Sequence, residues 1–354
     1  MKMQFKIKYF FLILISAFTL PQFISAQNKA DSSLIKWYNF DEAQALNAKT
    51  PKPMLVDIYT DWCGWCTKMM KTTYANQQIA DFINLNFYPI KFDAETSQKI
   101  TFNNKTYIKT GTEKRAPNQL AIEFIGEKLT YPSTIFIDKN GKRNLVSGYL
   151  DYNQILPLLI FFAEEVNKST NYNEFLDYFN QVYTQKDTSK ANFFKEYVKW
   201  ITMQEAIEKT KTVPKKIFLD IYNDWKTSCN IMRITTYNNP VIAEYLNKNF
   251  YPVRFDCVSK DTINIGGQVF INENKDHPFH QMAVAMLDGK MGFPALLIFD
   301  ENFKLVYKEQ AYFTPENLEP ILHFINEDLF KNTKWEDYLK TFKSEIKKNG
   351  TTNK

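Results

Sequence analysis

Histidine is scarce in this sequence and absent from its first half. The chain has 354 residues, but its histidines are limited to His277, His280 and His323, and it has four cysteines. A structural zinc site usually takes four Cys or His ligands, whereas the first half of the chain offers only Cys63 and Cys66. We therefore expect no metal centre. The three histidines are interpreted as ordinary surface or partly buried side chains.

The sequence also lacks an apolar run long enough to span a bilayer. Its longest run, residues 9–20, is well short of the roughly 20 residues that a transmembrane helix needs. Three lysines precede the run, and a proline and the small pair Ser25-Ala26 follow it, which is the layout of a secretory signal peptide over residues 1–26. An uncleaved anchor is the alternative. There is no cysteine near Ala26, so the sequence does not suggest a lipoprotein anchor. We therefore expect a periplasmic or secreted protein without stable membrane insertion.

A strong excess of either charge is missing as well. The formal net charge is +5, and removing residues 1–26, with three lysines and no acids, lowers it to +2. Nucleic-acid-binding proteins and proteins that bind anionic membranes usually carry a pronounced basic patch. We therefore expect no nucleic-acid partner.

The most informative feature that is present is a pair of cysteines two residues apart. Cys63 and Cys66 follow the apolar run 54–59, and residues 67–74 are predicted to be helical. Cys63 would then lie at a helix N-terminus, where unpaired N–H groups and the helix dipole favour a thiolate. The thiolate is the form that attacks a disulfide. A CxxC pair alone also occurs in zinc and iron–sulfur sites.

The surroundings of this pair resemble the active site of the thioredoxin superfamily. Trp62 precedes the motif, Asp57 lies six residues before Cys63, and Pro132 comes just before the predicted strand 134–138. The resemblance implies that Asp57 is buried beneath the dithiol and relays a proton to Cys66. It also implies that Pro132 is a cis-proline that faces the dithiol.

Within this family resemblance, each residue at the motif has an expected role. Cys63 would attack a substrate disulfide, and Cys66 would resolve the mixed disulfide. Trp65 lies between the cysteines and should be partly exposed, so its indole could contact a substrate peptide. We expect the substrate-binding residues to be Trp62, Trp65, Tyr131 and Pro132.

An internal repeat organises the rest of the chain. Residues 55–62 recur as 218–225, and residues 86–93 recur as 249–256, in both cases 163 positions apart. The repeat predicts two domains, residues 35–182 (the first repeat) and 198–345 (the second repeat), each large enough to bury its own core.

Each repeat alternates strands and helices and closes with a strand–turn–strand–helix segment. This order predicts an α/β fold of tandem thioredoxin-like three-layer sandwiches, with a central mixed sheet flanked by helices. Within the superfamily, the sequence is most similar to secreted bacterial thioredoxin-like proteins and to the C-terminal periplasmic domain of membrane disulfide-interchange reductases. For the first repeat we predict helices over 40–47 and 119–124, a helix beginning at Asp151, strands over 54–60, 87–93, 134–138 and 145–149, and a hairpin over 100–108. The insertion that contains this hairpin is expected to shape the surface over the dithiol.

The second repeat retains the predicted frame but loses the dithiol. Lys226 occupies the position of Cys63, and Cys229 alone matches Cys66, while Asp220 and Pro294 are retained. A lone resolving cysteine cannot run a dithiol cycle, so we expect this repeat to fold without catalysing exchange.

Three hypotheses remain open for Cys229. It is a small, partly buried side chain left by duplication, or it forms a second-domain disulfide with Cys257, which follows the strand 253–256. In the third hypothesis, it exchanges disulfides with the first repeat or with a partner.

The sequence therefore predicts an exported thiol–disulfide oxidoreductase. It needs no cofactor, because the electrons reside in the sulfurs, and its expected partners are protein disulfide substrates and an unidentified thiol–disulfide donor or acceptor. Reduction or isomerisation is favoured over oxidation by Asp57 and Trp62, although Gly64-Trp65 differs from the Gly-Pro of ordinary thioredoxin. The alternatives are an exported binding or chaperone-like module without turnover, and a redox sensor.

Overall fold

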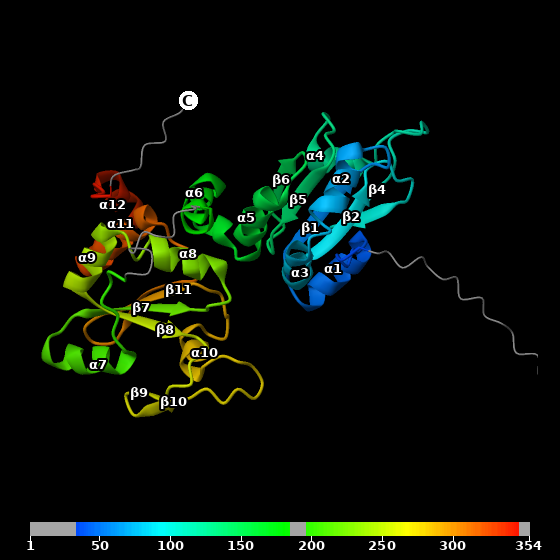
Figure 1. The fold of residues 1–354 in the computed structure, drawn as a ribbon. Helices are drawn as coiled ribbons and strands as arrows, with labels where there is room; N and C mark the ends of the chain where they lie inside the picture. Colours follow the sequence, from blue (N-terminus) through cyan, green and yellow to red (C-terminus); the bar gives the residue numbers. More distant parts are fainter. Residues whose placement is uncertain (1–32, 185–195, 347–354) are drawn as a thin grey trace, which may run out of the picture. The chain divides into compact units, whose positions relative to one another are not determined.

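Two four-stranded sheets, one in each repeat, form the centre of the computed structural model (Figure 1). The structure describes residues 33–184 and 196–346. The expected signal peptide over residues 1–26 lies outside the described residues. By their contacts, the described residues from Leu34 onward belong to one compact unit.

The first repeat follows the predicted order of elements. It contains α1 (Phe40–Lys49), β1 (Met54–Tyr59), α2 (Gly64–Thr72), α3 (Gln77–Asn86), β2 (Tyr88–Asp93), β3 (Ile100–Phe102), β4 (Lys105–Tyr107), α4 (Gln119–Ile125), β5 (Ser133–Ile137), β6 (Arg143–Ser147), α5 (Tyr152–Ala163), the 3-10 helix η1 (Val166–Lys168) and α6 (Tyr172–Tyr183).

The second repeat copies this order. It contains α7 (Met203–Thr212), β7 (Lys216–Tyr222), α8 (Thr227–Thr235), α9 (Pro240–Asn249), β8 (Phe250–Asp256), β9 (Ile263–Ile265), β10 (Gln268–Phe270), α10 (Gln281–Met286), β11 (Ala295–Phe299), β12 (Leu305–Glu309), α11 (Pro315–Asn326), the 3-10 helix η3 (Leu329–Lys331) and α12 (Trp335–Thr341).

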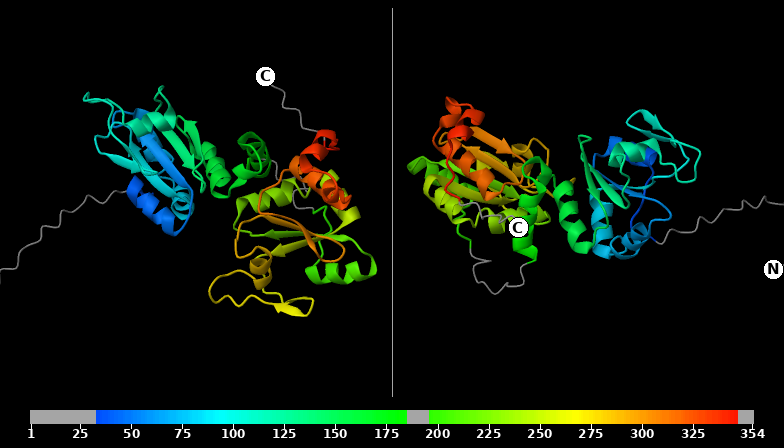
Figure 2. Two further views of the ribbon diagram at one scale, coloured as in Figure 1. Left: turned by 180° about the vertical axis from the view of Figure 1, so that it is seen from behind. Right: turned by 90° about the horizontal axis from the view of Figure 1, so that it is seen from above.

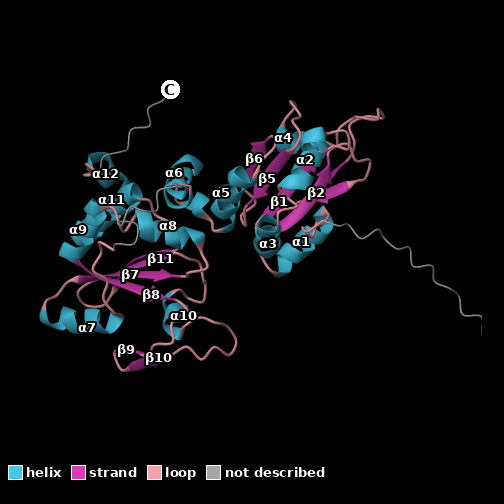
Figure 3. Cartoon of the chain, in the orientation of Figure 1, coloured by secondary structure: helices cyan, strands magenta, loops and turns pink. Residues whose placement is uncertain are grey.

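Both sheets have the same mixed topology. The strand order is β2-β1-β5-β6 in the first repeat and β8-β7-β11-β12 in the second. In each sheet the first two strands pair in parallel and the remaining pairs are antiparallel. Helices cover both faces of each sheet (Figures 2 and 3). This arrangement is a thioredoxin-like fold, as predicted.

Alternation along β1 distributes its side chains between two apolar cores. Leu55 packs into the cluster that includes residues of α2, α3 and α5, whereas Val56 and Ile58 pack into the cluster beneath α1 and α4. Because successive strand residues face opposite sides of a sheet, Asp57 lies on the same face as Leu55. In the second repeat, Figure 1 shows α8, α9 and α11 on one face of the sheet and α7 and α10 on the other.

The small hairpins form where the turn residues predict them. Asn103 and Asn104 have positive φ values of 50° and 62°, and the corresponding Gly266 and Gly267 have values of 60° and 87°. Asparagine and glycine tolerate this left-handed conformation better than other residues do. Each hairpin is a two-stranded sheet of its own.

Strand β6 differs most from its predicted bounds, whereas β1, β2 and β5 differ by one residue at one or both ends. We expected a strand over residues 145–149, but β6 runs from Arg143 to Ser147. Its pairing with β5 begins directly after the Asn140-Gly141 turn, with Ile137 opposite Arg143. It ends before Gly148, whose φ of 98° breaks the extended conformation.

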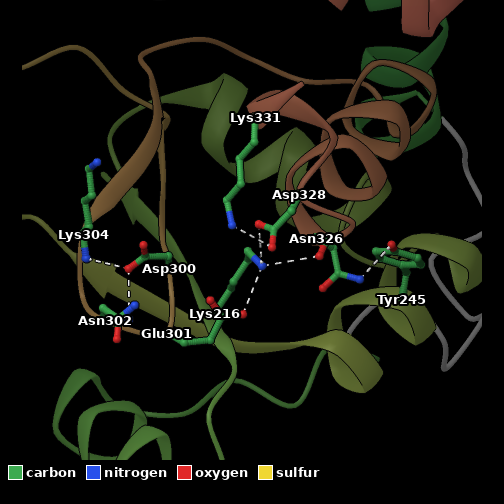
Figure 4. Close-up of polar contacts among 9 residues, drawn as sticks. All are labelled: Lys216, Tyr245, Asp300, Glu301, Asn302, Lys304, Asn326, Asp328 and Lys331. Carbon is green, nitrogen blue, oxygen red and sulfur yellow. Dashed lines mark hydrogen bonds and ion pairs between the residues drawn. The ribbon is translucent and has the colours of Figure 1, made fainter. Parts of the chain in front are cut away.

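A charged cluster fixes the start of the central strand β7, at the end opposite the helix start of α8. Lys216 is only 3% exposed, and its Nζ lies 3.0 Å from Glu301, 3.2 Å from Asp328 and 3.4 Å from the carbonyl oxygen of Asn326 (Figure 4). A buried ammonium group needs such partners to offset the loss of hydration. The cluster is a structural feature of the second repeat.

Within residues 33–184 and 196–346, no helix has both the length and the apolar character needed to cross a membrane.

Candidate active site

The two cysteines of the motif lie where β1 passes into α2. Cys63 is the N-cap residue of α2, and its backbone N–H donates to the Thr60 carbonyl oxygen at 3.1 Å, which closes the turn. Thr67 donates in turn to the Cys63 carbonyl oxygen at 3.1 Å. The predicted strand-to-helix junction is therefore present, and it places the motif at the N-terminus of a nine-residue helix.

Cys63 and Cys66 form a disulfide in this structure, so the site is in its oxidised state. The two residues are almost equally buried, with 6% and 5% of their surfaces exposed. Their hydrogen bonds distinguish them: the Cys63 sulfur accepts the Cys66 backbone N–H at 3.0 Å. A donor aimed at sulfur stabilises a thiolate, so this geometry favours Cys63 as the nucleophile once the pair is reduced.

Asp57 is a buried acid in the strand that leads to the motif. Its side chain is 2% exposed, and desolvation raises the pKa of its carboxyl group to about 7, against the lowering effects of the Lys91 charge and a hydrogen bond from Tyr74. A carboxyl group with this pKa can accept or release a proton near neutral pH. The burial expected from the family resemblance is therefore observed.

Trp62 joins the motif to the insertion between β2 and α4. The indole is 52% exposed, and its Nε1 donates to Glu95 at 2.8 Å. The Arg115 guanidinium lies 4.9 Å from the ring centroid, and Tyr131 meets the indole edge to face at 6.0 Å. Since Glu95 and Arg115 both come from the insertion, this segment shapes the surface beside the disulfide, as predicted.

Trp65 is exposed on the other side of the motif. Its side chain is 56% exposed, and its ring lies 5.4 Å from that of Tyr149. The Lys68 ammonium lies 4.6 Å from the Trp65 ring and 5.0 Å from the Tyr149 ring. Cations over aromatic faces restrict the rings while leaving apolar surface accessible, so the two tryptophans are available for contact with a polypeptide.

Both prolines expected to be cis have that configuration. The Tyr131–Pro132 and Phe293–Pro294 peptide bonds are cis, and each precedes the central antiparallel strand of its repeat. Through the contact between Tyr131 and Trp62, this segment is tied to the motif.

In the second repeat, the start of α8 has a lysine in place of the nucleophile, and a carboxylate from another helix binds its free N–H groups. Lys226 is the N-cap residue of α8 and makes no side-chain capping hydrogen bond. Instead, Glu164, the C-cap residue of α5, accepts the backbone N–H groups of Thr227 at 3.0 Å and Ser228 at 2.7 Å. A carboxylate is a favourable ligand for the free N–H groups of a helix start, and here it neutralises two of them with a fixed negative charge.

The buried acid of the second repeat has a different partner from Asp57. Asp220 is 2% exposed, and its Oδ2 accepts from Arg254 Nε at 3.1 Å. Burial raises the pKa of Asp220, and the guanidinium opposes this rise. Arg254 pairs with Asp220 across the strands as Lys91 pairs with Asp57, but no salt bridge joins Lys91 to Asp57 in the described part of the chain. The Lys91 ammonium lies 5.0 Å from the Tyr59 ring instead.

The disulfide considered between Cys229 and Cys257 is not formed in the structure. Both residues are buried free thiols within one apolar cluster. Desolvation raises the pKa of Cys257 to about 12 and that of Cys229 well above its ordinary value. Apolar burial keeps both thiols protonated, which agrees with the hypothesis that Cys229 is a buried side chain left by duplication.

The histidines serve local structure, and one is more deeply buried than expected. His280 is fully buried and caps α10: its Nδ1 accepts the Met282 N–H at 3.1 Å, and its Nε2 lies 2.9 Å from the Asp261 carbonyl oxygen. The prediction of a surface or partly buried side chain was wrong for His280. A histidine two residues before an apolar helix segment can act as an N-cap, and the spacing in the sequence did not reveal this role.

Three residues near the two sites were missed by the sequence analysis. Tyr74 and Lys91 have counterparts 163 positions later, Tyr237 and Arg254, so comparing the repeats could have singled them out. Glu164 also has a counterpart 163 positions later, Glu327, but no motif in the sequence marks Glu164 as the residue that binds the start of α8.

Comparison with protein families gives two matches along the chain. The family model Thioredox_DsbH, described as "Protein of unknown function, DUF255", matches residues 25–188 and again residues 179–349. An uncharacterized protein of Archaeoglobus fulgidus is 32% identical over 82 residues, which are 22% of this chain. The alignment covers 64% of that relative's length.

Comparison with solved structures finds thioredoxin-fold proteins. A DsbH oxidoreductase matches 37% of this chain and 85% of its own, with 18% identity and a TM-score of 0.29. A thioredoxin from Thermus thermophilus matches 35% and 84%, with 16% identity and a TM-score of 0.26. The reduced C-terminal domain of Neisseria meningitidis DsbD matches 34% and 91%, with 14% identity and a TM-score of 0.25.

Proposed function

The chain belongs to the Thioredox_DsbH family, and we propose that it is an exported thiol–disulfide oxidoreductase that reduces or isomerises protein disulfides. The observation that carries the proposal is the Cys63–Cys66 disulfide at the N-terminus of α2, preceded in β1 by the buried Asp57, whose pKa is about 7. Export is inferred from the signal-like segment 1–26.

In the proposed reaction, the reduced protein begins with a thiolate at Cys63. This thiolate attacks a substrate disulfide, so one Cys63–substrate disulfide forms and one substrate sulfur leaves as a thiolate. Cys66 then loses its proton to Asp57 and attacks the Cys63 sulfur. The second substrate thiol is released, and the protein is left with the Cys63–Cys66 disulfide seen in this structure.

The substrate has been reduced by two electrons, and both came from the dithiol. An external dithiol must return the protein to its reduced form if it acts as a reductase. The exposed tryptophans Trp62 and Trp65, together with Tyr131 and Pro132, are proposed to bind the polypeptide around the substrate disulfide. The second repeat is proposed to be noncatalytic, because Lys226 replaces the nucleophile and Glu164 occupies the helix start.

Trapping of substrates tests the assignment. Cys66→Ser should accumulate mixed disulfides through Cys63, and Cys63→Ser should accumulate few, while the wild-type protein accelerates reduction of a model disulfide by a dithiol. Equal trapping by the two variants would contradict the roles of the cysteines. Binding of unfolded polypeptide without any acceleration would favour the alternative, a binding module without turnover.

The reduction potential separates the directions of electron flow. After equilibration with glutathione buffers, a potential near that of thioredoxin, about −270 mV, would support a reductase. A potential near about −120 mV would instead indicate an oxidase.

A further inference from the structure

Tyr74 is a buried phenol that reaches the proposed proton acceptor. It is 1% exposed, and its hydroxyl donates to Asp57 Oδ1 at 3.4 Å. This is the one hydrogen bond that the structure shows for the Asp57 side chain within residues 33–184 and 196–346. The bond is longer than the roughly 3.0 Å upper limit usual for O–H···O hydrogen bonds, but it lies in a core where hydrogen bonds to a carboxylate are strengthened by the low dielectric.

The position of Tyr74 is fixed from several sides. Its backbone N–H donates to the Met69 carbonyl oxygen at 3.0 Å, which ties it to the last turn of α2. The preceding residue, Thr73, donates through its hydroxyl to the Leu150 carbonyl oxygen at 2.6 Å. Trp37 packs edge to face on the Tyr74 ring at 5.3 Å. The phenol is therefore held in place by the same helix that carries Cys66.

The charged groups near Tyr74 determine the protonation state of its hydroxyl. The titratable groups that act on Asp57 are Lys91 from β2 and Tyr74 from the end of α2. Burial and the negative charge of Asp57 raise the pKa of Tyr74 well above its ordinary value. The hydroxyl consequently stays protonated and acts only as a donor to the carboxylate.

We propose that Tyr74 is a positioning residue that holds Asp57 Oδ1, leaving Oδ2 to take the proton of Cys66 when the mixed disulfide is resolved. This inference rests on the proposed function and adds a residue to it. The proton passes from the Cys66 thiol to the carboxylate, and the phenol keeps its own proton throughout. A donor to the charged form of a carboxylate makes that form easier to reach, so the Tyr74 hydrogen bond opposes the rise that burial causes in the pKa of Asp57.

The test replaces the hydroxyl and keeps the ring. Tyr74→Phe should raise the midpoint of the pH dependence of mixed-disulfide resolution by about one pH unit, which lowers the rate at pH 7 by about fivefold and leaves the rate well above the midpoint unchanged. Formation of the mixed disulfide should not change. A residue that only packs would not shift the midpoint.

Tyr237→Phe is the matched control. Tyr237 stands at the same position of the second repeat and packs against Trp200 at 5.0 Å, as Tyr74 packs against Trp37. This variant removes an equivalent buried hydroxyl but should leave the pH profile of resolution unchanged. A shift of equal size in this variant would overturn the specific role of Tyr74.

A second measurement is independent of catalysis. The Asp57 carboxyl carbon can be titrated by NMR in the oxidised protein, with Asp57→Asn identifying the signal, and Tyr74→Phe should move its midpoint upward. Coincident titrations in wild type and variant would overturn the positioning role even if the wild type exchanges disulfides. Absence of disulfide exchange in the wild type would overturn the proposed function. The titration does not require exchange, so it would still show whether Tyr74 lowers the pKa of Asp57.

Discussion

Arg254 binds the buried Asp220 at 3.1 Å, whereas among the described residues Lys91, at the equivalent position of the first repeat, makes no such ion pair with Asp57. The two acids occupy the same register in their sheets, each opposite a basic residue on the neighbouring parallel strand. A guanidinium offers a planar set of donors that matches a carboxylate, while an ammonium on a flexible chain is free to lie elsewhere. The repeat with the dithiol therefore keeps its buried acid available for proton transfer, and the repeat without it keeps its acid paired.

Exchanging this basic residue tests that difference. Lys91→Arg should place a guanidinium beside Asp57 and lower its pKa below the value of about 7. The midpoint of the pH profile for mixed-disulfide resolution should fall. The rate one pH unit below the wild-type midpoint should rise several-fold, because more of the carboxylate is ionised there. Arg254→Lys is the control and should not affect the profile. An unchanged midpoint in Lys91→Arg would show that the lysine does not set the basicity of Asp57.

The stability of the oxidised protein should depend on pH through Asp57. Its pKa is about 7 in the folded protein, against an ordinary value of 3.8 for an aspartate. Between these values the folded state holds a proton that the unfolded state has lost, so unfolding releases a proton and stability falls as pH rises. A shift of this size corresponds to about 4 kcal/mol.

Asp57→Asn removes this dependence. In denaturant unfolding at a series of pH values, the stability of the variant relative to wild type should increase from pH 4 to pH 8, by up to about 4 kcal/mol. Asp220→Asn should show a smaller change, because Arg254 stabilises the ionised form of Asp220. A difference between Asp57→Asn and wild type that stays constant with pH would contradict the raised pKa.

The cluster around Lys216 gives a prediction about the second repeat alone. Glu301 and Asp328 are 37% and 40% exposed at their side chains, so water can solvate them when the lysine is removed. Lys216→Met should therefore lower the free energy of unfolding by about 1–2 kcal/mol. The joint change Glu301→Gln and Asp328→Asn leaves a buried ammonium without a counter-charge, so it should lower the free energy of unfolding by about 3 kcal/mol or more. Urea unfolding measures both. If Lys216→Met cost more stability than the joint change, the carboxylates, and not the ammonium, would be the groups that need a counter-charge.

Local patterns in the sequence, together with the family resemblance, predicted the fold and the position of the Cys63–Cys66 pair at the start of a helix. The apolar run before Cys63 and the offset between repeats predicted β1, α2 and the duplicated sheet, because strand and helix periodicity are local properties. The hairpin predicted over 100–108 formed for the same reason, with Asn103-Asn104 as its turn.

Contacts between distant segments could not be predicted in this way. The Tyr74–Asp57 hydrogen bond depends on how the end of α2 packs over β1. The contact of Glu164 with α8 depends on tertiary packing over 63 positions of sequence. The free state of Cys229 and Cys257 likewise depends on side-chain directions that spacing does not determine.

The occupied start of α8 changes the outcome expected from restoring the second dithiol. The second repeat retains Asp220, Cys229 and a cis Pro294, so Lys226→Cys should create a CxxC pair with Cys229. However, the Glu164 carboxylate already accepts the N–H groups of Thr227 and Ser228. A thiolate at position 226 would lie next to this negative charge, which raises the pKa of the new thiol and slows its reactions.

Adding Glu164→Gln to Lys226→Cys should remove that charge. Starting from the reduced protein, with Cys63 and Cys66 replaced by serine, alkylation of the new thiol at pH 7 should be about tenfold faster in the presence of Glu164→Gln, since loss of an adjacent like charge lowers a pKa by about one unit. Glu327→Gln is the matched control, because Glu327 stands at the corresponding position of the second repeat and contacts His323 at 2.9 Å instead of a helix start. Equal alkylation rates with and without Glu164→Gln would mean that the carboxylate does not suppress reactivity at the start of α8. The absence of a cysteine at position 226 would then be enough to explain why the second repeat is noncatalytic.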